Sequence, residues 1–204
     1  MSQQSFADLG LSRPIVRALA DRGITTPFAI QSLVIEDVLD GADVLAKSPT
    51  GSGKTIAFAA PVLDVLERDA RRPSALVLAP TRELVTQIDD EVQGFAYHTP
   101  VSSVAVYGGV PMEPQERALK AGVDIVIATP GRLLDHMRSG VGDFSKLEVF
   151  VLDEADRMMD MGFWPDVRRI AEALPPSTER QTMLFSATMP DEVLKFADAL
   201  APDA

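Results

Sequence analysis

Six short apolar runs alternate with amphipathic segments from about residue 43 onward, and this alternation constrains the fold most strongly. The apolar runs lie at 43–47, 75–79, 103–107, 124–128, 149–152 and 182–186. They are continuous rather than alternating in polarity, which is typical of parallel strands covered on both faces. Segments between them, such as 81–97 and 165–173, have the periodicity of amphipathic helices. The sequence therefore predicts one α/β domain, a doubly wound and mostly parallel sheet flanked by helices.

Residues 1–42 differ in character from the rest of the chain. They read as short helices joined by a turn at 21–24. Thr25 or Thr26 is expected to cap the following helix, with Pro27 in its first turn. We therefore treat 1–42 as an N-terminal helical segment and 43–204 as the main domain.

Composition excludes several classes of protein. The 204 residues are 46% hydrophobic, enough for a core, and 24% charged. The absence of cysteine excludes disulfides and thiolate metal sites. No apolar run reaches the length of about 18 residues that a membrane span needs, and the N-terminus does not read as a secretory leader. We expect a cytoplasmic protein without membrane contact.

The net charge of −11 is unusual for a chain that binds nucleic acid. Such proteins generally present a basic surface to the phosphate backbone. The charge therefore favours a narrow nucleic-acid contact, if the chain makes one at all.

A glycine-rich turn, Ser48-Pro-Thr-Gly-Ser-Gly-Lys-Thr55, follows the first predicted strand. Lys54 is expected to reach the β- and γ-phosphates of a nucleotide, and the Thr55 hydroxyl to ligate Mg²⁺. Ser48 stands where the strict pattern has glycine, and its small side chain should leave the turn intact. The alternative is an ordinary strand-to-helix turn. Backbone N–H groups facing the phosphates would come from Thr50, Gly51, Ser52 and Gly53.

An acidic motif, Asp153-Glu-Ala-Asp156, follows the fifth apolar run directly. Asp153 is the expected partner of Mg²⁺, through water, and Glu154 could orient or deprotonate an attacking water. Lys54, Asp153 and Glu154 are therefore the predicted catalytic residues. Alone, such a pair is more often a solvated helix start; the phosphate loop upstream favours the nucleotide site.

Further motifs surround these two in a fixed order, and together they resemble those of the DEAD-box ATP-dependent RNA helicases over nearly the whole chain. The resemblance implies a RecA-like fold, with ATP and Mg²⁺ as cofactors and RNA as a partner. The motifs are 23–31, Pro80-Thr-Arg-Glu-Leu84, Gly108-Gly109, Thr129-Pro-Gly-Arg132, Asp-Glu-Ala-Asp at 153–156 and Ser186-Ala-Thr188.

The segment 23–31 resembles the adenine-reading motif of that family. Gln31 carries both a donor and an acceptor, so its amide can pair with the N6 and N7 edge of adenine. Phe6 could cover a face of the base, although core packing is the alternative for it. The chain departs from the family at Ile24, where an aromatic residue is usual, and at Phe28, where a small polar residue is usual.

The next motifs resemble the RNA contacts of the family. Their hydroxyl, guanidinium and backbone N–H groups suit phosphates and 2′-hydroxyls, so they read the backbone and not the sequence. For each arginine taken singly, a surface salt bridge is the alternative. The predicted RNA-binding residues are Pro80, Thr81, Arg82, Gly108, Gly109, Thr129, Gly131 and Arg132.

Ser186 and Thr188 resemble the motif that couples hydrolysis to strand separation. The resemblance implies that their hydroxyls bond Asp156, which would make Asp156 a coupling group rather than a catalyst. The same residues could equally cap a helix before Pro190, and the two roles do not exclude each other.

Few residues follow Thr188, so we expect this chain to be the first half of a two-domain helicase, monomeric and separated from its second RecA-like domain. An arginine from that second domain normally completes the site, so the chain alone should bind nucleotide with little turnover. RNA affinity would then depend heavily on the other half. The competing interpretations are a DNA helicase or another phosphate-loop ATPase, and a non-catalytic RNA clamp.

Overall fold

The computed structural model describes residues 4–66 and 72–202, and its strands form a single sheet. The strand order is β1-β6-β5-β2-β4-β3, and every neighbouring pair runs parallel. This confirms the predicted doubly wound sheet, and each strand lies within one residue of its predicted bounds. The strands are β1 (Val44–Lys47), β2 (Ala75–Leu78), β3 (Ser103–Val106), β4 (Ile125–Ala128), β5 (Val149–Leu152) and β6 (Gln181–Ser186).

The continuous apolar runs are explained by burial of both faces of the sheet. In β2, Ala75 and Val77 face one core cluster while Leu76 and Leu78 face the other. All four residues are buried, whereas the edge strands β1 and β3 carry partly exposed positions. A central strand of this kind has no polar face, so its sequence does not alternate between polar and apolar residues.

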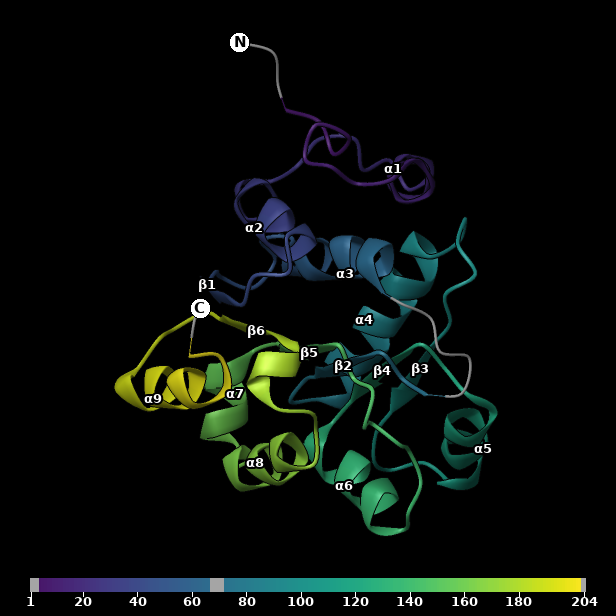
Figure 1. Cartoon of the computed structure of the whole chain (residues 1–204), viewed down its shortest axis with the longest axis vertical. Coiled ribbons are helices and arrows are strands. Elements are labelled where there is room, and N and C mark those ends of the chain that lie inside the picture. Colours follow the sequence, from purple (N-terminus) through teal and green to yellow (C-terminus); the bar gives the residue numbers. More distant parts are fainter. Residues whose placement is uncertain (1–3, 67–71, 203–204) are drawn as a thin grey trace.

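The helices on one face of the sheet lie in the upper part of Figure 1, where the first of them packs outside the others. Phe58 of the third helix packs against Phe185 of β6, with ring centroids 5.3 Å apart. The helices are α1 (Arg13–Asp21), α2 (Ala29–Leu39), α3 (Lys54–Val65) and α4 (Arg82–Phe95).

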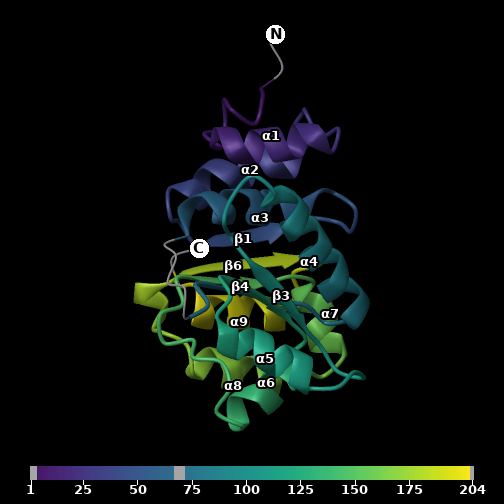
Figure 2. The same ribbon diagram turned by 90° about the vertical axis from the view of Figure 1, so that its right-hand side faces the viewer.

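The opposite face is covered by the remaining helices, which lie below the sheet in both views (Figures 1 and 2). Trp164 stacks on Phe196 there, with ring centroids 4.1 Å apart, so it is a packing residue. None of the helices among the described residues is long and apolar enough to cross a bilayer. These elements are α5 (Glu113–Ala121), α6 (Pro130–Arg138), α7 (Ala155–Asp160), α8 (Trp164–Glu172), α9 (Asp191–Leu200) and a 3₁₀ turn, η1 (Ser177–Glu179).

The N-terminal segment packs onto the upper helical layer. Ser12, at the start of α1, bonds Asp64 of α3 through both its backbone N–H and its hydroxyl. Phe6 is 2% exposed and belongs to the same core cluster as α3. The boundary placed after residue 42 stays a prediction.

The expected start of α2 is wrong. The helix begins at Ala29 and Phe28 occupies the N-cap position, so Pro27 lies before the helix and neither Thr25 nor Thr26 caps it. The reason is the Gln31 side chain, whose Oε1 accepts the Phe28 backbone N–H at 2.8 Å. That bond satisfies a backbone donor at the helix start, which is the role we had given to threonine.

We predict that Phe58→Ala lowers the free energy of unfolding by about 3–5 kcal/mol, because it removes a fully buried ring between α3 and β6. Leu33→Ala is the control: Leu33 is 71% exposed, so its truncation should cost less than about 0.5 kcal/mol. Urea denaturation measures both. Equal losses for the two variants would contradict the assigned core.

Candidate functional site

The predicted phosphate loop links β1 to α3. Gly53 has a left-handed backbone (φ 85°, ψ 24°) and precedes the first helical residue, Lys54. A side chain at Gly53 would collide with the Gln31 amide, so glycine is required for space as well as conformation. Ser48 Oγ lies 2.5 Å from Ser52 Oγ, so the serine that replaces the usual glycine closes the loop with a hydrogen bond.

Lys54 is the buried cation of the site. Its side chain is 7% exposed, and Nζ lies 3.5 Å from Asp153 Oδ1. Within the part of the chain that the structure describes, this ammonium has no hydrogen-bond partner. A buried donor without a partner is costly, and phosphate oxygens would satisfy it.

Asp153 directly follows β5 and faces Lys54. It is 2% exposed, and its burial raises the pKa of the carboxyl group; the Lys54 charge and the Glu154 N–H, which donates to Oδ1 at 2.9 Å, act against that rise. A desolvated carboxylate beside a single cation has capacity left for a second positive ligand.

Glu154 is the one described non-glycine residue with a positive φ (53°). Left-handed backbone is strained for such a residue and persists where the surroundings impose it, often at functional sites. The carboxylate accepts a hydrogen bond from Arg157 Nη1 at 3.1 Å. Sequence analysis found Glu154 but not this backbone conformation, because the four-letter motif carries no glycine or asparagine to signal it.

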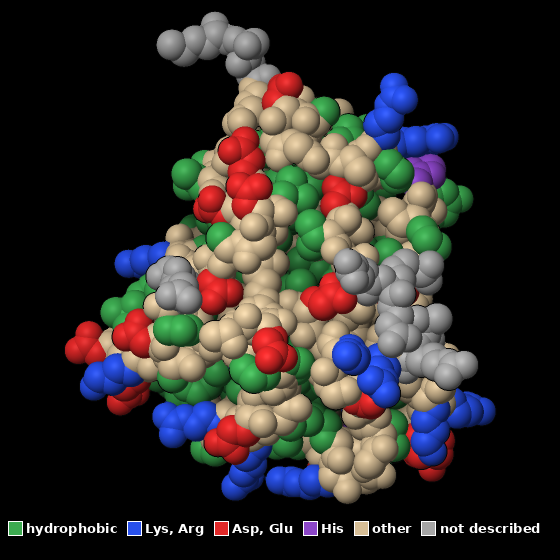
Figure 3. Space-filling model, viewed as in Figure 1, with side chains coloured by type: hydrophobic (Ala, Val, Ile, Leu, Met, Phe, Trp, Pro, Cys, Tyr) green, Lys and Arg blue, Asp and Glu red, His purple; other side chains and the backbone are tan. Residues whose placement is uncertain are grey.

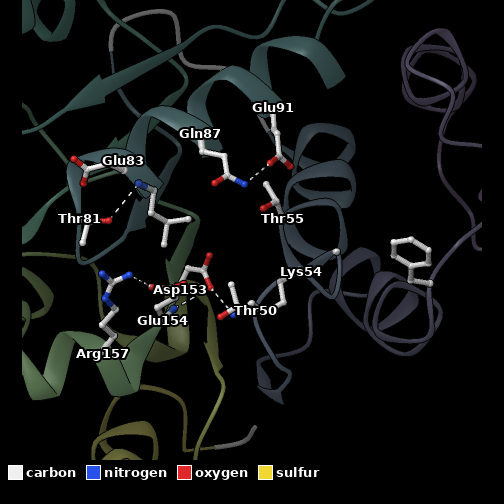
Figure 4. Close-up of a pocket in the computed structure, with 14 residues that line it drawn as sticks. Thr50, Lys54, Thr55, Thr81, Glu83, Gln87, Glu91, Asp153, Glu154 and Arg157 are labelled. Carbon is white, nitrogen blue, oxygen red and sulfur yellow. Dashed lines mark hydrogen bonds and ion pairs between the residues drawn. The ribbon is translucent and has the colours of Figure 1, made fainter.

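These groups line a pocket of about 430 Å³ between the phosphate loop, the end of β5 and α4 (Figure 4). Thr50, Lys54 and Thr55 lie on one side of it, and Asp153 and Glu154 on another. The sequence analysis missed its third wall. That wall comes from α4 and the turn before it, with Arg157 at the rim, and consists of Thr81, Glu83, Leu84, Gln87, Glu91 and Arg157.

A spacing of four residues could have revealed the α4 wall. Glu83, Gln87 and Glu91 recur at helical period and so share one face, and Gln87 donates to Glu91 at 3.1 Å (Figure 4). We had assigned the start of this helix only to RNA. Its position places it beside the predicted nucleotide site as well.

A divalent metal ion in this pocket would need ligands from water or from a bound nucleotide in addition to those of the protein. Among the described residues, no group of three His, Cys, Asp or Glu side chains gathers as a metal site. Thr55 and Asp153 nevertheless line the same pocket, which supplies one hydroxyl and one carboxylate. This donor set fits Mg²⁺, which commonly takes one or two protein ligands and completes its shell with water and phosphate oxygens.

Gln31 is 1% exposed and both ends of its amide are engaged. Oε1 accepts from Phe28, and Nε2 donates to the Gly53 carbonyl at 3.1 Å. The residue therefore ties the predicted adenine-reading segment to the phosphate loop. Gln31 is not among the residues that line the pocket, so its contact with adenine stays a prediction. Phe6 lies in the core and does not line this pocket, which agrees with the core-packing alternative given for it.

The predicted RNA residues lie at the ends of three neighbouring strands, β2, β4 and β3. Pro80 is buried, whereas Arg82 is exposed and its guanidinium lies 5.2 Å from the ring centroid of Tyr107. Thr81 caps α4 by accepting the Leu84 N–H at 3.3 Å, and it also lines the nucleotide pocket. The two predicted sites thus meet at Thr81.

A buried network holds the glycine pair against α6. Arg132 Nη1 donates to the Val110 carbonyl at 3.0 Å, and Gln115 donates to the Tyr107 carbonyl at 3.0 Å. His136 is fully buried and its Nε2 lies 3.1 Å from Gln115 Oε1; burial and the Arg132 charge lower its pKa. It is therefore a structural residue. The loop that carries Gly108 and Gly109 is fixed at both of its ends, while both glycines are exposed.

Thr129 and Gly131 flank the start of α6 and are partly exposed, with Thr129 at the N-cap position. Figure 3 shows one whole face of the molecule. On it, Lys and Arg side chains lie mostly singly around the rim and are interspersed with acidic ones. The strand arrows in Figure 2 point away from this face, so the predicted RNA residues, which follow the carboxyl ends of the strands, lie on the opposite side.

Asp156, Ser186 and Thr188 lie together as the resemblance implied. Thr188 Oγ1 donates to Asp156 Oδ2 at 2.7 Å, and the buried Ser186 hydroxyl accepts the Asp156 N–H at 3.0 Å. Burial acts to raise the pKa of Asp156, but these hydrogen bonds outweigh it and hold that pKa below its usual value. The capping alternative is wrong, because Pro190 occupies the N-cap position of α9 and the threonine is engaged by Asp156.

Comparison with known proteins supports this arrangement. A family model described as DEAD/DEAH box helicase matches residues 28–196. The ATP-dependent RNA helicase DeaD of Klebsiella pneumoniae is 50% identical over 192 residues, which cover 94% of this chain and 30% of the relative. The DEAD-box ATP-dependent RNA helicase 53 of Oryza sativa subsp. japonica is 46% identical over 97% of this chain and 33% of its own length.

A solved structure has the same fold. The crystal structure of a DEAD box protein from the hyperthermophile Methanococcus jannaschii superposes with a TM-score of 0.92 at 37% identity, covering 99% of this chain and 55% of that one. The chain thus spans about a third of the length of the curated relatives it matches.

We predict that Thr188→Ala lowers the free energy of unfolding by about 1 kcal/mol near neutral pH, because it removes the hydroxyl bonded to the ionised Asp156. The pKa of Asp156 is lower in the folded state than the unfolded value of about 3.9. The stabilisation is therefore present above that unfolded value and is lost as the pH falls through the lower, folded one. Denaturation at several pH values measures this.

Thr188→Ser is the matched control, because it keeps the hydroxyl and should keep most of the stability. A wild-type-to-alanine difference that is the same at pH 7 and at pH 2 would contradict the link to Asp156.

Proposed function

The chain belongs to the DEAD/DEAH box helicase family, and on this basis we propose that it is the ATP- and RNA-binding part of an ATP-dependent RNA helicase. The observation that carries the proposal is the Lys54–Asp153 ion pair at 3.5 Å, inside a pocket walled by both the phosphate loop and the acidic motif. The reaction is hydrolysis of ATP by water, coupled to local opening of an RNA duplex. Relatives of the chain are named for the same activity.

In the nucleotide site, Lys54 holds the β- and γ-phosphates with an ammonium that has no other hydrogen-bond partner among the described residues. Thr55 and Asp153 hold Mg²⁺, which when bound neutralises the charge on the phosphates. Glu154 orients the attacking water or takes its proton. The phosphates otherwise rest on the backbone N–H groups of the loop, from Thr50, Gly51, Ser52 and Gly53.

Gln31 reads the edge of the adenine with the hydrogen-bonding capacity that its contacts to Phe28 and Gly53 leave over. The same amide joins that segment to the phosphate loop. A base bound to the Gln31 amide is therefore linked to Gly53 through one side chain.

RNA binds across the ends of β2, β4 and β3, through phosphates and 2′-hydroxyls and without sequence preference. Exposed Arg82 and the exposed glycine pair supply the accessible groups, while Arg132 works mainly by holding the loop that carries the glycines. The full proposed set is Pro80, Thr81, Arg82, Gly108, Gly109, Thr129, Gly131 and Arg132.

Coupling between the two sites is assigned to Asp156, Ser186 and Thr188. Their hydrogen bonds join the helix after the acidic motif to the end of β6. Any shift of Glu154 on hydrolysis is then transmitted to the segment after β6.

Full turnover and strand opening are proposed for a protein in which this part works with a second RecA-like domain. The one arginine among the described pocket residues, Arg157, is already paired with Glu154 at 3.1 Å. A second arginine that contacts the transferred phosphate is worth roughly 10³–10⁵ in rate in comparable systems. We therefore expect the 204 residues alone to bind ATP and to hydrolyse it slowly.

The test is nucleotide binding by this chain, measured by calorimetry with ADP and with a non-hydrolysable ATP analogue. We predict that Lys54→Ala weakens the binding of both ligands at least about tenfold, because a charged hydrogen-bond donor to phosphate is lost. Glu154→Gln should bind both as the wild type does and should abolish any residual hydrolysis. Lys47→Ala is the control, since Lys47 is exposed on β1 and outside the pocket.

Absence of binding by the wild type, or equal binding by Lys54→Ala and the wild type, would refute the nucleotide site. Unchanged hydrolysis in Glu154→Gln would refute only the role given to that carboxylate.

A further inference from the structure

Phe28 is exposed in a way that the fold does not explain. Its side chain is 61% exposed, and the residue stands at the N-cap position of α2. It belongs to neither of the two core clusters formed by the described residues. A large apolar ring left in water gives up the stabilisation that burial would bring. Leu33, Tyr97 and Met161 are also strongly exposed, but only Phe28 of these lines the nucleotide pocket.

The ring stands next to the phosphate loop. A Cβ built on Gly53 would lie 3.0 Å from Cδ2 of Phe28, so the ring edge covers the residue that precedes Lys54. Among the described residues that line the pocket, Phe28 is the one aromatic side chain. Phosphate-binding groups and an exposed aromatic ring thus belong to the same pocket.

The backbone of Phe28 is fixed by hydrogen bonds, which places its Cβ beside the phosphate loop. Its N–H donates to Gln31 Oε1 at 2.8 Å, and its carbonyl accepts from Gln31 N and Ser32 N, both at 3.0 Å. The same Gln31 amide also bonds the Gly53 carbonyl. Ring, amide and loop therefore form one connected unit.

The two other aromatic or apolar candidates for a base contact are used elsewhere. Phe6 is 2% exposed in the core, and Ile24 packs against that same core cluster. Neither lines the pocket. When the phosphates of a nucleotide lie on the loop, Phe28 is the planar side chain available to its base.

We propose that Phe28 supplies the stacking face for the base of the bound nucleotide, in place of the aromatic residue that the family usually has at the position of Ile24. The inference rests on the proposed nucleotide site and adds a binding residue to it. Stacking on a ring tolerates any base, because every base has a π-face. Phe28 therefore contributes affinity, while selection of adenine stays with Gln31.

The test is calorimetric titration of ADP and GDP, in the presence of Mg²⁺, into the wild type, Phe28→Ala, Phe28→Trp and Leu33→Ala. Loss of one base-stacking contact should weaken ADP binding about tenfold in Phe28→Ala. The ratio of ADP to GDP affinity should not change in that variant. Phe28→Trp should bind ADP as tightly as the wild type or more tightly. Leu33→Ala, changed at an exposed site of the helix that follows Phe28, should match the wild type.

Fluorescence gives an independent reading of the contact. Trp164 is the only tryptophan of the wild type and lies away from this pocket, so it provides the baseline. In Phe28→Trp, added ADP should quench the new emission by stacking, whereas inorganic tripolyphosphate, which has no base, should not.

Equal ADP affinity in Phe28→Ala and the wild type would overturn the inference and leave the nucleotide site standing. So would a Phe28→Trp protein as weak as Phe28→Ala, since that would show disruption of the loop rather than loss of stacking. A wild type that binds no ADP at all would instead overturn the proposed function, and this inference with it.

Discussion

The insertion of β6 between β1 and β5 is the constraint on which the rest of the molecule depends. These strands come from opposite ends of the chain, with Val44 paired to Met183 and Val149 paired to Gln181. Because the pairing is parallel, the loops that follow all three strands emerge at one edge. Lys54, Asp153 and Ser186 reach the same region only for that reason.

The geometry at this edge favours ligand binding over stability. A buried ion pair such as Lys54–Asp153 gains little net stability, because desolvation offsets much of the attraction. Glu154 adds backbone strain next to it. An ammonium with no hydrogen bond among the described residues, a desolvated carboxylate and a strained glutamate are costs that a bound nucleotide with its metal would relieve. The six-stranded sheet and its two cores are what sustain them.

The sheet order also separates two tasks. Loops after β1, β5 and β6 carry the nucleotide and coupling groups, and loops after β2, β4 and β3 carry the predicted RNA contacts. Thr81 stands at the boundary, as the cap of α4 and a wall of the pocket. We infer that any communication between the sites runs through such shared elements, because no single loop spans the whole edge.

Much of this could be read from the sequence, and the limits have physical causes. The strands were predicted to within one residue because burial on both faces leaves an unbroken apolar run. The phosphate loop was predicted because no residue other than glycine fits at position 53, so the glycine pattern is visible in the sequence. The start of α2 was misplaced, since nothing local shows that the Gln31 side chain replaces a threonine cap. The exposure of Phe28 and the left-handed backbone of Glu154 have no such signal, because an apolar residue predicts burial and no glycine or asparagine marks the position with positive φ.

The most direct test of the central claim is the Mg²⁺ dependence of ADP binding, because the claim requires Lys54 and Asp153 to serve one ligand. The account predicts that Mg²⁺ tightens binding roughly tenfold in the wild type and in Asp160→Asn, a change at an exposed acid outside the pocket, but not in Asp153→Asn. Retention of the full Mg²⁺ effect in Asp153→Asn would contradict it.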